Sequence, residues 1–131
     1  ASLYVMWKQG VDTVTWFNMR DDAPKPSYDT TYQSGVYFRG DTVAQDTPKP
    51  SFTAFRFPFT AYRTKGVARL WGLAPARGKV LIQARRGSSW RTVTTATAAS
   101  NRLFQGKLRV GRGTRLRAVQ GQDVSRTWLV F

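Results

Sequence analysis

A short polar cluster in the first part of the chain offers the side chains best suited to hold a polar ligand. Asn18, Arg20, Asp21 and Asp22 provide an amide, a guanidinium and two carboxylates within five residues. Adjacent carboxylates suggest acid/base chemistry, but carboxylates that act as a pair usually lie across a bound substrate and come from different strands. Two interpretations stay open: a ligand-binding loop, and a solvated loop start in which Arg20 pairs with Asp21 or Asp22.

Composition excludes several kinds of chemistry. The 131-residue chain contains no Cys, no His and no Glu, so its only side-chain carboxylates are those of seven Asp residues. Without Cys and His there is no thiolate or imidazole metal ligand, no Ser-His-Asp triad and no cysteine nucleophile. We therefore predict no catalytic residue, no metal ion and no cofactor in this chain. The absence of Cys fits both a secreted and a cytosolic protein.

A second group of candidate residues is basic. Residues 1–60 carry six basic and six acidic residues, whereas residues 61–131 carry 15 basic residues and one acid, so the net charge of +14 lies in the second part. If residues 111–113 form a three-residue hairpin loop, like charges face each other on one sheet face. Such a patch suits an acidic polymer, either an acidic glycan or a nucleic acid. Its members are Lys107, Arg109, Arg115 and Arg117.

The basic residues also have a simpler interpretation. An Arg-rich outer face keeps a protein soluble without binding any ligand. No motif typical of nucleic-acid-binding proteins, such as a basic recognition helix, is visible in the sequence. The patch therefore stays a prediction with an open alternative.

The first part of the chain must position the polar cluster. Its pattern predicts a helix over residues 2–9, a buried strand over 12–18, a long loop over 19–48 and a helix over 49–57. Val14, Trp16 and Phe17 alternate with threonines in the predicted strand, which leads directly into the polar cluster. The long loop carries aromatic residues that either line a cleft or anchor the loop, namely Tyr28, Tyr32, Tyr37 and Phe38.

The second part of the chain has a different sequence pattern. Short β-rich runs separated by Gly and Pro turns predict a small antiparallel sandwich. The change in charge and period places a domain boundary near residues 61–66, so we expect one domain at residues 1–60 and another at 61–131. No apolar run approaches the ~20 residues of a membrane span.

The segments VDTVTWFNMRDD, GVYF and PKPSFTAFRF, in this order, resemble the C-terminal end of the catalytic domain of (β/α)8-barrel glycoside hydrolases that use two glutamates. The resemblance implies an α+β fold: the last βα unit of a TIM-type barrel, followed by a small immunoglobulin-like or fibronectin-like accessory β-sandwich. It implies that Trp16 stacks on a sugar ring and that Asn18, Arg20 and Asp21 help to bind substrate. The catalytic glutamates would lie outside this chain, since a whole barrel needs about 250 residues.

The resemblance therefore implies the C-terminal portion of a secreted or cell-surface bacterial glycoside hydrolase that acts on polysaccharide and is not catalytic alone. Its partners would be the polysaccharide, bound through the missing barrel, and the N-terminal remainder of the enzyme as another chain. An acidic polymer stays open as a further partner. Two other functions stay open: a non-catalytic binding module for acidic polymers, and a structural segment that pairs with another chain. For the last, we expect residues 12–18 and 49–57 to leave an unpaired edge.

Overall fold

The structure is a computed structural model that describes residues 1–27, 29 and 31–131. Tyr28, one of the predicted loop aromatics, lies outside the described residues. The described chain contains the helices α1 (Ser2–Lys8) and α2 (Pro50–Arg56) and a short 3-10 helix, η2 (Val43–Gln45). Its strands are β1 (Tyr37–Phe38), β2 (Thr47–Pro48), β3 (Phe59–Thr64), β4 (Val67–Leu73), β5 (Gly78–Arg86), β6 (Ser89–Ala98), β7 (Leu103–Arg109), β8 (Arg115–Gln120), β9 (Asp123–Val124) and β10 (Trp128–Leu129).

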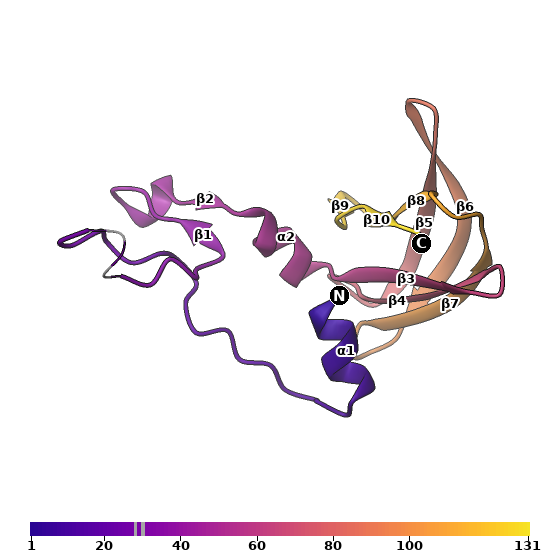
Figure 1. Ribbon diagram of the computed structural model, residues 1–131, viewed down its shortest axis with the longest axis horizontal. Helices are drawn as coiled ribbons and strands as arrows, with labels where there is room; N and C mark the ends of the chain where they lie inside the picture. Colours follow the sequence, from indigo (N-terminus) through magenta and orange to yellow (C-terminus); the bar gives the residue numbers. More distant parts are fainter. Residues whose placement is uncertain (28, 30) are drawn as a thin grey trace.

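Two antiparallel sheets form the main body of the molecule (Figure 1). One has the order β3-β4-β7, and the other has the order β10-β8-β5-β6 with β9 also paired to β8. The mostly β architecture is compatible with the predicted sandwich. We call these two sheets the sandwich.

The core lies between the two sheets, because alternate residues of each strand point inward. Phe104 and Leu70 enter it from the three-stranded sheet, and Ile82 and Leu116 enter it from the other sheet. Gly72 leaves room for Phe104, since a Cβ atom at Gly72 would lie only 2.3 Å from the Phe104 ring. The core thus fills the space between the sheets with little tolerance for added atoms.

Helix α1 forms a third layer on the outer face of the β3-β4-β7 sheet (Figure 1). The Tyr4 ring lies 5.5 Å from the Trp71 ring and 5.0 Å from the Tyr62 ring, and the Trp7 ring lies 5.7 Å from the Trp71 ring. Trp71 points away from the core, yet it is only 2% exposed. The helix therefore protects an aromatic surface that the sheet alone would present to water.

Residues 11–57 extend away from the sandwich, and we call them the arm (Figure 1). Residues 11–18 run from α1 to the far part of the arm, where β1 and β2 pair, and α2 returns the chain to β3. Helices α1 and α2 confirm the predicted helices at 2–9 and 49–57 to within two residues. Helix α2 has Pro50 in its first turn and ends before Pro58, as proline chemistry requires.

The predicted strand over residues 12–18 is wrong. These residues are extended, but in the described chain none of them forms a backbone–backbone hydrogen bond. Their alternating apolar pattern favours an extended conformation, while a strand also needs a partner, and nothing in the described residues pairs with this segment. Val14, Trp16 and Phe17 are exposed as a result.

The predicted fold class is also wrong. The chain is not an α+β fold with the last βα unit of a TIM-type barrel: it is mostly β, with three antiparallel sheets. A parallel βα unit needs a neighbouring parallel strand, whereas the described residues of the first part of the chain form the two-residue antiparallel pair β1-β2 and a single isolated parallel bridge between Arg20 and Tyr37. Neither α-helix in the described residues is long and apolar enough to cross a membrane.

Candidate functional site

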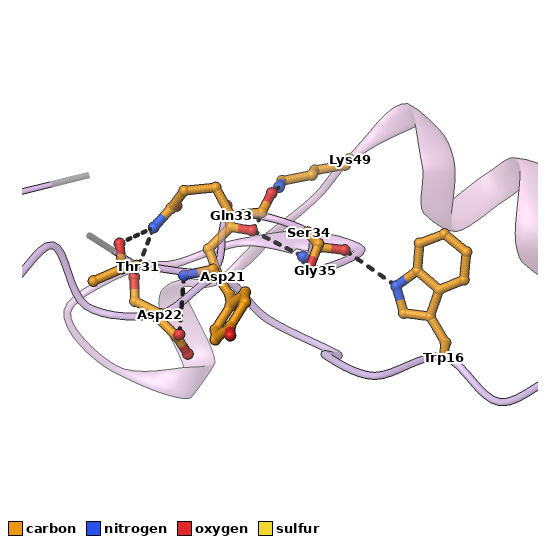
Figure 2. A network of polar contacts seen from close by, with 9 residues as sticks. Trp16, Asp21, Asp22, Thr31, Gln33, Ser34, Gly35 and Lys49 are labelled. Carbon is orange, nitrogen blue, oxygen red and sulfur yellow. Dashed lines mark hydrogen bonds and ion pairs between the residues drawn. The ribbon is translucent and has the colours of Figure 1, made fainter. Parts of the chain in front are cut away.

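Asp21 is bound within the arm by its own neighbours (Figure 2). It is 5% exposed, and its Oδ1 accepts hydrogen bonds from Lys49 Nζ at 2.6 Å and from the Gly35 N–H at 3.1 Å. Lys49 Nζ also donates to the Gln33 carbonyl at 3.0 Å. The carboxylate that sequence analysis assigned to substrate binding therefore joins the loop to the start of α2.

Arg20 pairs with Asp46, not with Asp21 or Asp22. Arg20 Nη2 lies 2.6 Å from Asp46 Oδ1, which also accepts the Gly40 N–H at 2.9 Å. The Gly40 hydrogen bond, with a further contribution from Arg20, holds the pKa of the Asp46 carboxyl below its ordinary value. Asp22 accepts a hydrogen bond from the Tyr32 N–H at 3.1 Å. The polar cluster thus holds separate parts of the arm together through side-chain contacts.

Asn18 and Trp16 differ from their charged neighbours. Asn18 Nδ2 is buried without a hydrogen-bond partner. Trp16 is 44% exposed, its Nε1 donates to the Ser34 carbonyl at 3.1 Å (Figure 2), and its ring lies 5.5 Å from the Phe55 ring. The predicted substrate-binding residues therefore separate, and Trp16 lines a cavity.

That cavity is a cleft of about 330 Å³ where α1, α2, β3 and β10 meet, and we call it the aromatic cleft. Trp16 lines it together with Tyr4 and Phe55 from the helices, and Trp71 and Trp128 from the strands. Ligand sites of this size are typically apolar clefts with a few well-placed polar groups. The remaining lining residues are Ala1, Ser2, Leu3, Ala54, Phe57, Pro58, Phe59, Thr60, Arg126 and Thr127.

Three polar atoms in the walls of the aromatic cleft lack a partner. Thr60 Oγ1, Trp71 Nε1 and Trp128 Nε1 are buried and form no hydrogen bond among the described residues. Leaving a buried polar group unpaired costs about 1–3 kcal/mol, so native structures keep few of them. Thr60 and Trp71 are opposite each other across the β3–β4 pair, which places their side chains on the same outer face. A hydroxyl group or a water molecule in the cleft would satisfy these atoms.

The sequence patterns do not predict a site that includes Thr60, Trp71 or Trp128. They lie on three strands and are separated by 11 and 57 positions along the chain. Strand pairing joins Thr60 to Trp71, and packing of β10 against β3 from the other sheet brings in Trp128. No spacing rule could have grouped them with Trp16, which enters the cleft from the unpaired arm segment.

The four predicted polyanion-binding residues do not form one patch. Lys107 is paired with Arg69 in the three-stranded sheet, whereas Arg115 and Arg117 are paired with Leu129 and Gln83 in the other sheet. The connection over residues 111–113 crosses between the sheets, so the predicted hairpin pairing is wrong. Lys107 and Arg109 point outward on one side of the sandwich, and Arg115 and Arg117 point outward on the other.

Arg117 is already engaged on its own face. Its guanidinium lies 4.3 Å from the centre of the Trp90 ring, and its Nε donates to Gln83 Oε1 at 2.8 Å.

Among the described residues, no group of acidic side chains is arranged to hold a metal ion. Comparison of the chain with protein-family models, with curated proteins and with solved structures finds no match.

Proposed function

We propose that this chain is a non-catalytic carbohydrate-binding part of a polysaccharide-degrading system, and that the aromatic cleft holds a sugar ring. The observation that carries the proposal is the combination of aromatic walls with three unpartnered hydrogen-bonding atoms in one cleft. The resemblance of the N-terminal segments to glycoside hydrolases suggests the same substrate class. On this proposal the protein acts outside the cell or at its surface.

The chemistry of the aromatic cleft suits a sugar. The apolar face of a pyranose packs against an indole ring, while the ring N–H donates to a hydroxyl. Trp71 Nε1 and Trp128 Nε1 are donors only, and Thr60 Oγ1 can donate or accept, so together they match the hydroxyl groups on a sugar edge. A volume of about 330 Å³ is at the lower end of the range for small-molecule sites and fits one or two sugar rings.

The same residues do not support hydrolysis. No side chain lining the aromatic cleft carries a carboxylate. Glycoside hydrolysis needs a pair of carboxyl groups on opposite sides of the glycosidic bond. We therefore expect binding without turnover.

Affinity measurements with three variants test the proposal. Soluble oligosaccharides from several plant and microbial polysaccharides are titrated into the parent protein by calorimetry. Trp16→Ala should weaken binding about tenfold by removing a stacking surface. Thr60→Val should weaken it about fivefold or more by removing a hydrogen bond. Trp90→Phe is the matched control, because Trp90 lies under Arg117 on the opposite side of the sandwich, and it should leave affinity unchanged.

Two results would reject the carbohydrate proposal. One is the absence of binding to every glycan in the panel, with water alone filling the cleft. The other is binding that Trp16→Ala and Thr60→Val leave as strong as in the parent, which would place the sugar elsewhere.

A second candidate function is assembly with another polypeptide, and the extended segment favours it. In the described chain, residues 12–18 keep their backbone groups unpaired and expose Val14, Trp16 and Phe17. An extended segment of this kind can add to the edge of a sheet in a partner, with its backbone giving affinity and alternate side chains giving specificity. The catalytic polypeptide of a glycoside hydrolase is the partner that the resemblance suggests.

Hydrogen exchange tests this second candidate. The amides of residues 12–18 should exchange freely in the isolated chain and become protected when the chain is expressed with its flanking coding sequence. Thr13→Pro should leave the melting temperature of the isolated chain unchanged, because the Thr13 N–H has no backbone partner to lose. If these amides stay unprotected in the longer polypeptide, the segment does not pair with anything there.

A further inference from the structure

Four arginine side chains line one pocket at the end of the sandwich. The pocket has a volume of about 340 Å³ and lies between the turn that joins β5 to β6 and the connection that joins β7 to β8. The β5–β6 turn projects at the top of the view in Figure 1. The pocket is lined by Arg85, Arg86, Gly87, Arg112, Gly113, Thr114 and Arg115, and we call it the arginine pocket.

No acidic group neutralises the arginine pocket. In residues 61–131 the only acidic side chain is that of Asp123, and its carboxylate pairs with Arg56 at 3.0 Å. Throughout the described chain, no carboxylate forms an ion pair with any of the four guanidinium groups. Like charges that share a pocket repel one another, and an anion in their midst relieves that repulsion.

The backbone that carries these arginines is well anchored. The Gly113 N–H donates to the Val130 carbonyl at 2.8 Å, and the Val130 N–H donates to the Thr114 carbonyl at 2.9 Å. Val130 is fully buried in the core, so this loop is held to the sandwich. On the other side, Arg85 Nε donates to the Gly87 carbonyl at 3.1 Å, and Gly87 has a φ of +58°, which suits glycine in a tight turn. Anchored loops lose little entropy on binding.

The geometry points to an anion site, and we propose that the arginine pocket binds a phosphate or sulfate group. Guanidinium groups present their N–H donors in a planar fork that matches the oxygens of such groups, and they stay charged at every physiological pH. The mainly polar walls and the volume of about 340 Å³ leave room for the anion and for part of the molecule that carries it. This proposal is independent of the sugar proposal, because no residue lines both the arginine pocket and the aromatic cleft.

Titration with inorganic sulfate and inorganic phosphate tests the site. Ionic strength is held constant with sodium chloride, since nonspecific attraction to a chain of charge +14 depends on it. The side-chain Nε–Hε resonances of the arginines and the amides of Gly87 and Gly113 report binding by NMR. In the parent, these signals should shift along one saturating curve, while those of Trp16 stay in place.

A pair of charge-matched variants separates a site from general attraction. Arg86→Gln with Arg112→Gln should weaken sulfate binding about tenfold or more, because it removes two guanidinium forks from the pocket. Lys107→Gln with Arg109→Gln removes the same two charges from the outer face of the other sheet and should change it less than twofold. Equal weakening by both variants, or no saturable shift in the parent, would overturn the proposal.

A sulfated polysaccharide distinguishes the source of the anion. Heparin is titrated under the same conditions as inorganic sulfate. Tighter binding of heparin that the Arg86→Gln, Arg112→Gln variant loses assigns the pocket to sulfate groups on a polymer. Saturable binding of the inorganic ions with no gain from heparin assigns it to the free anion. Heparin binding that both variants reduce alike would reflect surface charge and count against the pocket.

Discussion

At the level of single residues, the aromatic cleft contains buried polar groups that lower the stability of the ligand-free protein. Thr60 is 1% exposed and Trp71 is 2% exposed, and both keep a polar atom without a partner. Selection for stability alone would replace such groups with apolar ones. A buried polar group without a hydrogen bond carries a desolvation penalty, which an apolar group of the same shape avoids. Polar atoms retained at a cost in stability are characteristic of binding sites.

The first prediction uses that cost. Thr60→Val should raise the free energy of unfolding of the ligand-free protein by about 1 kcal/mol, since valine keeps the branched shape of threonine and removes its hydroxyl. Urea denaturation measures the change. A loss of stability would mean that the Thr60 hydroxyl has a partner, such as a bound water. The same variant should bind sugar more weakly, so its stability and its affinity should move in opposite directions.

The second prediction concerns two glycines of the β3-β4-β7 sheet. Gly72→Ala should destabilise the sandwich by about 1–3 kcal/mol, because the new methyl group would overlap the Phe104 ring. Gly106→Ala is the matched control: its Cβ would lie 3.4 Å from Leu70 Cδ1, so it should cost less than about 1 kcal/mol. Thermal denaturation compares them. Equal melting temperatures for the two variants would show that the core repacks freely around Phe104.

At the level of helices, strands and loops, the arm is held by ion pairs and the sandwich by apolar packing. Asp21–Lys49 joins the loop to the start of α2, and Arg20–Asp46 joins two further parts of the arm. The Asp46 carboxylate, whose pKa is lowered in the folded arm, makes the arm sensitive to acid, whereas burial of Phe, Ile and Leu does not depend on pH. The two parts of the molecule should therefore differ in their acid stability.

The third prediction follows from Asp46. Its pKa is lower in the folded arm than in an unfolded chain, chiefly because of the Gly40 N–H, so its ionised form stabilises the arm. This contribution is complete above the ordinary Asp pKa of about 3.9 and is lost as the pH falls through the lower, folded value. The Gly40 amide resonance should therefore shift on acidification below about pH 4, before the sandwich unfolds. Asp46→Asn should abolish that titration. A Gly40 signal that does not change down to sandwich unfolding would contradict the assignment.

Local patterns predicted the elements that depend on local chemistry. The helices at 2–9 and 49–57 were found because a proline opens or stops one of them and because apolar residues recur at helical spacing. Residues 12–18 were misassigned because alternation favours an extended backbone but says nothing about the partner strand. Turn residues 111–113 mark the end of β7, but they do not reveal whether the chain returns to the same sheet or crosses to the other one.

The candidate sites were harder to predict for the same reason. Trp16 was singled out, and it does line the aromatic cleft, but its companions come from β3, β4 and β10. Asp21 was assigned to ligand binding because the sequence alone does not distinguish a carboxylate that binds a ligand from one that pairs within its own loop. Only the structure reveals that the Asp21 carboxylate forms an ion pair with Lys49.

At the scale of the whole molecule, the proposed binding of carbohydrate is expected to occur without turnover by this chain. The fourth prediction is that it releases no reducing sugar from any polysaccharide that it binds. It has no Glu, and Asp21 and Asp22 are both engaged by the arm. A reducing-sugar assay over a panel of polysaccharides measures this. Turnover that Asp21→Asn abolishes would show that the carboxylate leaves Lys49 to act on substrate.

The contact of Tyr4 and Trp7 in α1 with Trp71 holds two parts of the chain together, and we call this contact the clasp. Because residues 11–57 lie between the helix and β3, the contact between Trp7 and Trp71 closes a loop of chain that contains the whole arm. Closing a loop costs entropy that grows only with the logarithm of its length, about 0.6 kcal/mol for each doubling. Insertion of residues into the unpaired segment should therefore cost little stability, whereas removal of the Tyr4 and Trp7 rings should release α1 from the sheet. We therefore expect the arm to tolerate changes in its length while the clasp keeps its position on the sheet.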